Sequence, residues 1–325
     1  MASSELSKIA RLAALFGGHE APGVTLGIGD DAAVLRPPAG RELVWTVDAQ
    51  VEGEHFRRDW MTWGDVGWRS FVAAASDLAA MGADPWCALS SLVLPAGFPD
   101  DALDALTGGQ ADAALAVGCP IVGGNLSRGG ELSVTTTLLG SVDRAVRRDG
   151  ARVGDGVWLA GSVGLAGAGL RALMAGRSGG ELDAAIDAFR RPRVRIAEGR
   201  TLGSKAHAAI DVSDGLAQDA GHIATASRVA LVLDESRLLA HAGQIVGRAA
   251  LLLNESALRL VLTGGEDYAL LATSAEPLDG FARVGDVEAG DGVWLHGPNA
   301  ERRRLSGNEQ RGFDHFERPR DESRE

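Results

Sequence analysis

The sequence predicts an α/β or α+β protein built from two domains. Short apolar runs alternate along the chain with longer Ala-rich stretches, which is the pattern of strands interleaved with helices. The 325 residues exceed the length at which a single hydrophobic core usually stops growing. With 45% hydrophobic and 23% charged residues, the composition is that of an ordinary globular protein.

The individual elements follow from these runs. Residues 1–18 place apolar side chains at helical spacing with two basic residues between them, which predicts an amphipathic helix rather than a signal peptide. Strands are expected at 42–48, 119–124, 132–142, 156–161, 229–234 and 267–273. Helices are expected at 64–82, 100–117, 164–175, 192–205 and 214–227, with Pro192 in the first turn of its helix.

A polar, Gly-rich segment at 147–156 marks the expected domain boundary. We therefore expect an N-terminal domain over 1–148 and a C-terminal α/β domain over 149–317, followed by a disordered, charged tail at 318–325. The hexapeptide GDGVWL occurs at 154–159 and again at 290–295. Because the repeat stops after six residues, it indicates two similar Asp-Gly turns entering strands, not a duplicated domain.

The charge of the chain argues against nucleic acid or an anionic membrane surface as the main partner. The formal net charge is −12, whereas both of those partners favour basic patches. No apolar run approaches the ~20 residues of a membrane span. Cys87 and Cys119 show no metal-ligand or redox spacing, so we expect buried, reduced cysteines of a cytoplasmic protein. An acidic protein can still bind phosphates where metal cations mediate the contact.

Acidic residues recur at Gly-containing ends of apolar runs in both halves of the chain. Taken singly, most of them could be turn residues or, like Ser213 and Asp214, helix caps. Asp77 differs because its surroundings, SFVAAASDLAAMGA (70–83), are apolar almost all round and offer no Arg or Lys three or four residues away. The candidates are Asp30, Asp31, Asp48, Asp77, Asp211, Asp214 and Glu266.

Several carboxylates that converge repel one another unless divalent cations neutralise them. Mg²⁺ prefers hard oxygen ligands and often bridges carboxylates to substrate phosphates. The chain has no GxxxxGK[ST] loop, no protein-kinase motif set, no GxSxG and no defensible Ser/His/Asp arrangement. The stretch DVSDG misses the DxDG spacing of haloacid-dehalogenase phosphatases by one residue. The residues therefore indicate a phosphate-handling site built on metal ions.

Seven segments, in order, resemble the thiamine-monophosphate kinase family. They are GIGDDAAVL, TVDAQVEGEHF, SDLAAMGADP, VGGNLSRG, AIDVSDGLAQD, LTGGEDYALL and GFDHF, and the resemblance covers nearly the whole chain. The wider superfamily, with aminoimidazole ribonucleotide synthetase and selenide, water dikinase, shares the acidic loops but not this full set. The Cys-bearing N-terminal loop of the selenium enzyme is absent.

The resemblance implies a two-domain, aminoimidazole ribonucleotide synthetase-like fold whose N-terminal domains pair in a homodimer, with ATP in a cleft between the domains. It implies conversion of ATP and thiamine monophosphate to ADP and thiamine diphosphate, assisted by several Mg²⁺ ions. The implied metal ligands are Asp31, Thr46, Val47, Asp48, Asp77, Asp211 and Asp214, of which Asp48, Asp77 and Asp211 are catalytic. ATP would contact Gly124, Asn125, Arg148 and Ser213, and thiamine monophosphate would contact His55, Glu266 and Phe313. Asn125 replaces the Asp of many members, which leaves one metal position open.

The chemistry of the acceptor agrees with this reading. A phosphate monoester is largely a dianion at neutral pH and needs no general base, so positioning and charge neutralisation are the main requirements. We expect direct, in-line transfer. Two alternatives stay open: another ATP-dependent enzyme of the superfamily, and a nucleotide- and Mg²⁺-binding regulator without catalysis. The hydrogenase-maturation dehydratase needs a C-terminal Cys that this sequence lacks, and a regulator need not keep His55, Glu266 and Phe313.

Overall fold

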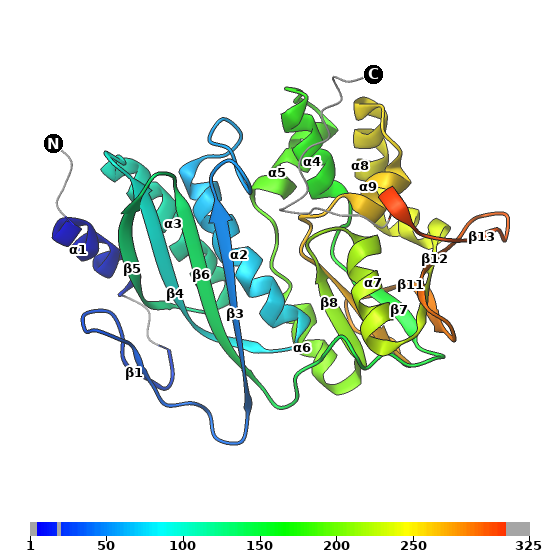
Figure 1. The fold of residues 1–325 in the computed structure, drawn as a ribbon, viewed down its shortest axis with the longest axis horizontal. Helices are drawn as coiled ribbons and strands as arrows, with labels where there is room; N and C mark the ends of the chain where they lie inside the picture. The colour runs from blue at the N-terminus through cyan, green and yellow to red at the C-terminus, as the bar shows by residue number, and fades with distance from the viewer. Residues whose placement is uncertain (1–4, 18–20, 310–325) are drawn as a thin grey trace.

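The computed structural model describes residues 5–17 and 21–309 as two α/β units that lie side by side (Figure 1). The N-terminal unit holds α1 (Glu5–Phe16), β1 (Val24–Leu26), β2 (Val34–Leu35), β3 (Glu42–Val51), α2 (Trp63–Ala80), β4 (Asp84–Pro95), α3 (Asp100–Val117), β5 (Ile121–Gly129) and β6 (Ser133–Val142). The mixed α/β class predicted from the alternating pattern is confirmed.

The C-terminal unit has the larger sheet and more helices. Its elements are β7 (Gly156–Ala160), α4 (Leu165–Met174), α5 (Glu181–Arg190), α6 (Ile196–Lys205), β8 (Ala208–Val212), α7 (Leu216–Ser227), β9 (Ala230–Asp234), α8 (Glu235–Leu253), α9 (Ala257–Thr263), β10 (Ala269–Ser274), β11 (Ala282–Glu288), β12 (Gly292–His296), β13 (Arg302–Arg304) and the short η1 (Gly307–Glu309). The strands form a seven-stranded sheet in the order β13-β12-β9-β11-β7-β10-β8.

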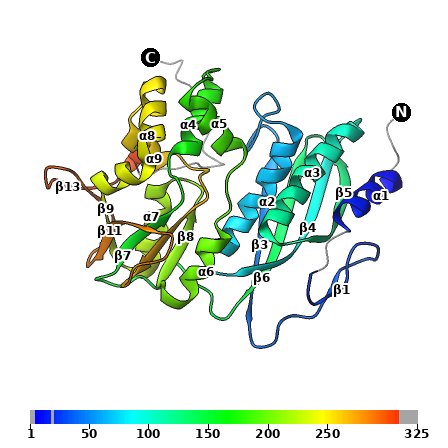
Figure 2. The ribbon, with the colours of Figure 1, turned by 180° about the vertical axis from the view of Figure 1, so that it is seen from behind.

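The four-stranded N-terminal sheet, in the order β3-β6-β4-β5, has helices on one face only. Figure 1 looks onto its open face, and Figure 2 shows α2 and α3 in front of it from behind. The side chains of β3 alternate accordingly, since Val44 is buried while Leu43, Trp45 and Val47 are exposed. This alternation is typical of an antiparallel sheet with one covered face.

Helix α2 lies between the two sheets. Its Phe71 and Leu78 share a hydrophobic cluster with Val44 of the N-terminal sheet and with Ala209 and Leu270 of the C-terminal sheet. The helix therefore buries side chains on opposite sides, which explains why its sequence is apolar almost all round.

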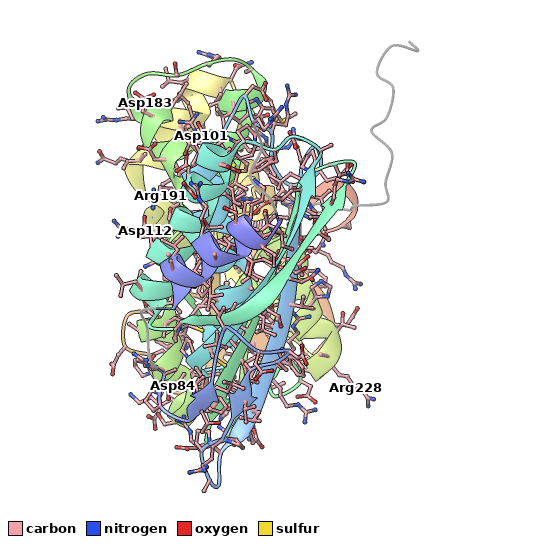
Figure 3. The ribbon with its side chains drawn as sticks, turned by 90° about the vertical axis from the view of Figure 1, so that its left-hand side faces the viewer. Asp84, Asp101, Asp112, Asp183, Arg191 and Arg228 are labelled. Atoms are coloured by element: carbon pink, nitrogen blue, oxygen red, sulfur yellow. The ribbon has the colours of Figure 1, made fainter. Side chains whose placement is uncertain are left out.

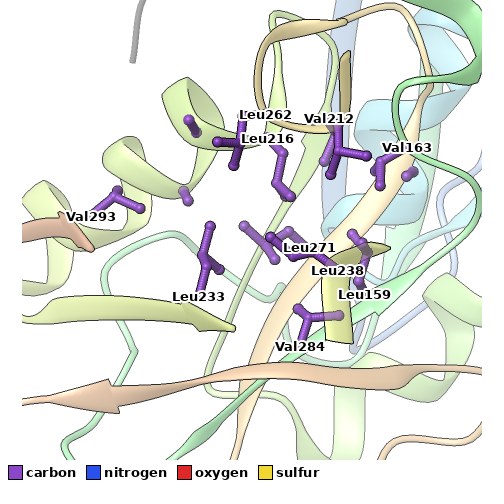
Figure 4. Packing of buried hydrophobic residues seen from close by; sticks show 14 of the residues in the cluster. Leu159, Val163, Val212, Leu216, Leu233, Leu238, Leu262, Leu271, Val284 and Val293 are labelled. Atoms are coloured by element: carbon purple, nitrogen blue, oxygen red, sulfur yellow. The ribbon is translucent and has the colours of Figure 1, made fainter. Parts of the chain in front are cut away.

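The other face of the C-terminal sheet carries the second core. Leu159, Leu271 and Val284 of three strands pack with Leu216 of α7 and Leu238 of α8 (Figure 4). Neighbouring residues of β7 and β10 face the opposite way, into the cluster around α2. Both faces of this sheet are thus buried, and it is held rigidly against the N-terminal unit.

The structure adds elements that the sequence did not predict, namely β1, β2, β4, α5, β8, α8, α9, β11 and β13. The run of β4 was missed because it is bounded by Pro85 and Pro95, which lie at the ends of the strand, where proline is tolerated. The helix expected at 192–205 begins only at Ile196. The Pro192 carbonyl accepts a hydrogen bond from Trp68 Nε1 of α2 at 2.9 Å, and Pro192 lies before the helix, not in its first turn.

Several smaller expectations can be placed on the structure. Cys87 and Cys119 are buried and free, as predicted. The two GDGVWL segments lead into β7 and β12. The domain limits at 148 and 317 stay predictions, and the tail at 318–325 lies outside the described residues. None of the helices in the described ranges combines the length and apolar character that crossing a bilayer requires.

The helix pair α2–α3 depends on two glycines at its crossing. A Cβ on Gly109 would lie 2.0 Å from the Gly64 carbonyl oxygen, and one on Gly67 would lie 1.8 Å from the Leu106 carbonyl oxygen. Gly108, the neighbour of Gly109 in α3, has open space at the same position.

We expect Gly109→Ala to lower the free energy of unfolding by about 1–3 kcal/mol, the usual cost of overpacking. Gly108→Ala should leave it unchanged or raise it by up to ~1 kcal/mol, because alanine is the better helix former. Denaturant unfolding followed by circular dichroism compares the two variants. Equal effects at both positions would show that the helices do not need this close approach.

Candidate active site

Two cavities meet at a wall formed by Asp77 of α2 and Asp211 of β8. The smaller cavity, of about 410 Å³, extends from this wall past Thr46 to Arg148 in the segment between the two sheets. The larger cavity, of about 560 Å³, extends on the other side. Both cavities are lined by Asp77 and Asp211, so the two carboxylates lie between them.

The larger cavity has an acidic, an aromatic and a basic part. Its acidic residues are Asp48, Glu54, Asp77, Asp211, Asp214 and Glu266, its aromatic residues Phe56, Trp60, Phe189 and Tyr268, and its basic residues Arg57, Arg171 and Arg259. His55 and Ser213 also line it. A cavity with this lining suits a ligand with both an anionic group, bound through cations, and an aromatic or cationic group.

The carboxylates at the shared wall are poorly solvated and close to one another. Burial raises the pKa of Asp77, and the charge of Asp48 raises it further, although the Thr46 hydroxyl donates a hydrogen bond to Asp77. Burial also raises the pKa of Asp211, and Asp77 adds to the effect. Such a group of carboxylates is stable when charged only if a cation neutralises it. Their oxygens, with the Thr46 hydroxyl, fit the ligands that Mg²⁺ prefers.

The loop after β8 is shaped by a residue that sequence reasoning missed. The carboxylate of Asp219, 1% exposed, accepts backbone N–H groups of Ser213 at 3.1 Å, Asp214 at 3.2 Å and Gly215 at 3.1 Å. Neither Ser213 nor Asp214 caps α7 with its side chain, since the helix begins after Gly215 without a side-chain cap. Both side chains instead line the larger cavity. The available signal was a second Asp five residues after Asp214, near the start of the helix predicted at 214–227.

The loop between α9 and β10 has unusual backbone geometry. Gly265, Glu266 and Tyr268 have φ values of +66°, +62° and +48°. Left-handed geometry costs a residue with a side chain roughly 1–2 kcal/mol and is concentrated at functional sites. The Glu266 N–H donates to the Ser213 carbonyl at 2.7 Å, which joins this loop to the loop after β8. A Cβ on Gly265 would lie 2.8 Å from that same carbonyl oxygen, so only glycine fits.

The adjacent acids Glu266 and Asp267 have different roles. Asp267 turns away from the cavity and accepts the N–H groups of Gly164 at 2.6 Å and Ala166 at 2.9 Å, at the start of α4. Burial raises its pKa to about 7, although both N–H donors favour the charged form. Glu266 lines the larger cavity. Asp267 therefore anchors the loop, and Glu266 is the one that can meet a ligand.

His55 is oriented by the backbone of its own turn. Its Nδ1 accepts the N–H of Val51 at 3.2 Å, and the residue lines the larger cavity. Because Nδ1 acts as an acceptor, the neutral ring carries its proton on Nε2. His55 can thus donate a hydrogen bond to a ligand from Nε2.

Four of the predicted site residues are not brought to these cavities. Gly124 and Asn125 lie on β5, whereas Asp48 lies on β3, the strand at the opposite edge of the sheet. Gly124 is in register with Asp48, but β6 and β4 lie between them. Asn125, the next residue of β5, points to the open face of the sheet. Val47 also faces that side and is 64% exposed.

Asp31 is the fourth of these residues. It lies in the exposed loop of the β1–β2 hairpin, where the Asp30 carboxylate accepts its N–H at 2.8 Å. The hairpin packs through Leu35 against Cys87 and Leu139 near the open face. Phe313 lies outside the described residues. The single chain therefore gathers nine predicted residues at the cavities, namely Thr46, Asp48, His55, Asp77, Arg148, Asp211, Ser213, Asp214 and Glu266.

The fold and the site together define the class of protein. The chain matches the family described as AIR synthase related protein, with its N-terminal domain over residues 29–142 and its C-terminal domain over residues 152–296. The thiamine-monophosphate kinase of Aquifex aeolicus (strain VF5) is 33% identical over 296 residues, which are 89% of this chain and 92% of that protein. The enzyme of the same name from Mycobacterium tuberculosis (strain H37Rv) is 35% identical over 87% and 85% of the two chains. The chain belongs to the thiamine-monophosphate kinase family.

Solved structures agree with this assignment. The crystal structure of thiamine-monophosphate kinase from Stenotrophomonas maltophilia K279a superposes with a TM-score of 0.80 at 34% identity, covering 91% of this chain and 97% of that one. A structure described as AaThiL complexed with AMPPCP and TMP superposes with a TM-score of 0.79 at 28% identity, covering 96% and 97%. The hydrogenase maturation protein HypE shares the fold alone, at 20% identity and a TM-score of 0.75.

The buried acids predict how stability depends on pH. Because folding raises the pKa of Asp77 and Asp211, the folded, metal-free protein holds more protons than the unfolded chain, and stability is lost as pH rises through the raised pKa. We expect Asp211→Asn in a chelator to raise the melting temperature by about 2–4 °C at about pH 8. At about pH 5 the difference should be clearly smaller, because Asp211, whose pKa is raised to about 7, is then protonated in the folded protein and no longer repels Asp77.

Asp155→Asn is the matched control. Asp155 is 2% exposed but is satisfied by His207 Nδ1 at 2.9 Å and the Arg152 N–H at 2.9 Å. Its replacement should lower the melting temperature at both pH values, because it breaks hydrogen bonds to a buried group. If Asp211→Asn were also less stable than the wild type at the higher pH, the idea of electrostatic repulsion at the wall would be wrong.

Proposed function

We propose that this protein transfers the γ-phosphoryl group of ATP to the phosphate of thiamine monophosphate, giving ADP and thiamine diphosphate. The observation that carries the proposal is the pair Asp77–Asp211, which lies between two cavities. Each cavity can take one phosphorylated substrate, and the carboxylates lie where the two phosphate ends would meet. The names of the relatives and the complex with an ATP analogue and TMP support the same reaction.

Several Mg²⁺ ions complete the proposed site. Asp48, Asp77, Asp211 and Asp214 would hold them, with the Thr46 hydroxyl and, in the assembled protein, Asp31, the Val47 carbonyl and Asn125. When bound, the ions neutralise the charges of two phosphate groups that otherwise repel each other. The amide oxygen of Asn125 is an uncharged ligand. In the smaller cavity, Arg148 is the cation whose charge acts on Asp77 and Asp211.

The transfer is proposed to be direct and in line. The acceptor phosphate is itself a competent nucleophile, so the protein needs no general base and gains nothing from a covalent intermediate. The side chains at the shared wall are carboxylates, which serve best as charged metal ligands. His55, with Nδ1 engaged by the backbone, and Glu266 would bind the acceptor, together with Phe313. The free, buried cysteines and the use of ATP suit a cytoplasmic protein.

Product analysis tests the reaction. With ATP and Mg²⁺, we expect thiamine monophosphate to yield thiamine diphosphate and ADP in equal amounts, and free thiamine or an aminoimidazole precursor to yield neither. Asp48→Asn should lower kcat by at least about a hundredfold, since it removes a charged ligand of the Mg²⁺ ions that would neutralise the phosphate charges in the transition state. Asp143→Asn, at a carboxylate that is 92% exposed and outside both cavities, is the control and should keep full activity.

Two results would contradict the proposal. Turnover of an aminoimidazole precursor but not of thiamine monophosphate would favour another enzyme of the superfamily, and binding of ATP without any turnover would favour a regulator. For the in-line step, the enzyme is incubated with γ-labelled ATP and Mg²⁺ in the absence of acceptor. Stoichiometric label on the protein that then chases into thiamine diphosphate would show a covalent intermediate.

We further propose that the protein is a homodimer joined through the open face of the N-terminal sheet. Leu43, Trp45, Val47 and Leu89 expose between 37% and 74% of their surface on this face. An apolar patch of this kind on a folded protein marks an interaction site. Asn125 and the hairpin with Asp31 lie on the same side, so pairing would carry them toward the partner chain. This would account for their separation from the cavities of a single chain.

Leu89→Glu should convert the dimer to a monomer and lower kcat, because a charge would be buried at the centre of the interface. Light scattering should give twice 33.7 kDa for the wild type and the single mass for the variant. Leu115→Glu, at an apolar residue of α3 that is 66% exposed, is the control for an added surface charge. It should change neither the mass of the dimer nor kcat. A wild-type monomer with full activity would rule out the pairing.

A further inference from the structure

Arg69 is a cation buried directly behind the larger cavity. It lies on α2, its side chain is 1% exposed, and Nη2 forms an ion pair with Oε2 of Glu266. Its Nη1 donates a hydrogen bond to the Phe189 carbonyl, and the guanidinium carbon lies 4.4 Å from the centroid of the Phe189 ring and 5.9 Å from that of Tyr268. Arg69 thus joins a helix of the N-terminal unit to two segments of the C-terminal unit.

The contacts leave one oxygen of Glu266 available. Tyr268 Oη donates to Oε2 of Glu266 at 2.9 Å, and the ion pair with Arg69 is to Oε2 as well. Oε1 takes part in neither contact. Since Glu266 lines the larger cavity and its side chain is 27% exposed, Oε1 is the atom that can meet a ligand there.

The positive charge of Arg69 depends on Glu266. Burial works against this charge, but Glu266 and, more weakly, Tyr268 and Asp48 outweigh it and raise the pKa of the guanidinium. Without Arg69, the Glu266 carboxylate would lose its buried cationic partner and could turn away from its present position, since Tyr268 Oη would be its one remaining partner among the contacts described above. The left-handed backbone fixes the direction in which the Glu266 side chain leaves the loop, and the ion pair with Arg69 fixes the position of its carboxylate.

We propose that Arg69 is a positioning residue for the acceptor: its ion pair keeps the Glu266 carboxylate aimed into the larger cavity, where Glu266 binds the cationic heteroaromatic part of the substrate. The identity of that acceptor rests on the proposed function. Two other roles are outcomes of the test. Arg69 would act alike on both substrates if it only clamped the two units together, and it would act on kcat if it only balanced the charge of Asp48.

The test is a double-mutant cycle on KM. Arg69→Met should raise the KM for thiamine monophosphate by about tenfold or more, the loss expected for one hydrogen bond to a charged group, while the KM for ATP changes less than about twofold. Glu266→Gln should have a similar effect. Adding Arg69→Met to Glu266→Gln should raise KM little further, because the two residues act through one contact. Independent, multiplying effects would overturn the proposal.

Two milder variants test the proposal even if Arg69→Met does not fold. Arg69→Lys keeps the charge but not the planar fork that reaches both Glu266 and the Phe189 carbonyl, so its KM for thiamine monophosphate should fall between those of the wild type and Arg69→Met. Tyr268→Phe removes the second donor to Oε2 and should raise the same KM by a smaller factor. If neither variant changes this KM, Arg69 does not act through Glu266, whatever happens to Arg69→Met.

Arg200→Met is the matched control for loss of an ion pair between the two units. Arg200 of α6 contacts Asp84 of β4 at 2.7 Å, and neither residue lines the smaller or the larger cavity. Asp84 is labelled in the side view of Figure 3. This variant should leave both KM values unchanged. An effect equal to that of Arg69→Met would show that Arg69 only holds the two units together. A wild type that does not phosphorylate thiamine monophosphate would contradict the proposed function instead.

Discussion

The burial of α2 between two sheets is the constraint on which the rest of the site depends. A helix packed on opposite sides can tolerate a charged residue only where a partner or a cavity meets it. Asp77 lies where the smaller and larger cavities meet, and Arg69 lies where Glu266 reaches across from the other unit. The single helix therefore fixes both the carboxylate at the shared wall and the cation behind the larger cavity.

The two loops of the C-terminal unit extend this arrangement without adding flexibility. Asp219 gathers three backbone N–H groups of the loop after β8, and Asp267 holds the next loop to the start of α4. The bond from Glu266 N–H to the Ser213 carbonyl then ties one loop to the other. Asp214 and Glu266 are thus held by two loops that are hydrogen-bonded to each other, which suits the proposed reaction because it depends on positioning.

The sequence predicted the acids of this site better than the residues that orient them. Asp77 could be found because a lone carboxylate in an apolar helix conflicts with burial. Arg69 could not be found in this way, because it binds the carbonyl of Phe189, which is 120 residues away in the chain. The positions of Gly124 and Asn125 were also out of reach, because motif order does not tell which edge or face of a sheet a strand occupies. The elements β4 and α8 were missed for local reasons, prolines at the ends of one and a left-handed Gly243 within the other.

The acidic character of the chain has a consequence for binding. With a net charge of −12, the protein as a whole repels ATP and a phosphorylated acceptor, so their attraction must be local. At the smaller cavity Arg147 is paired with Asp149, whereas Arg148 acts on Asp77 and Asp211. In the proposed reaction, the acceptor's ring charge and its phosphate charge need opposite partners at the larger cavity, which Glu266 and the proposed metal-binding acids would supply at separate places. Discrimination would then depend on holding these charges apart, with Arg69 positioning Glu266 and Asp219 positioning the loop after β8.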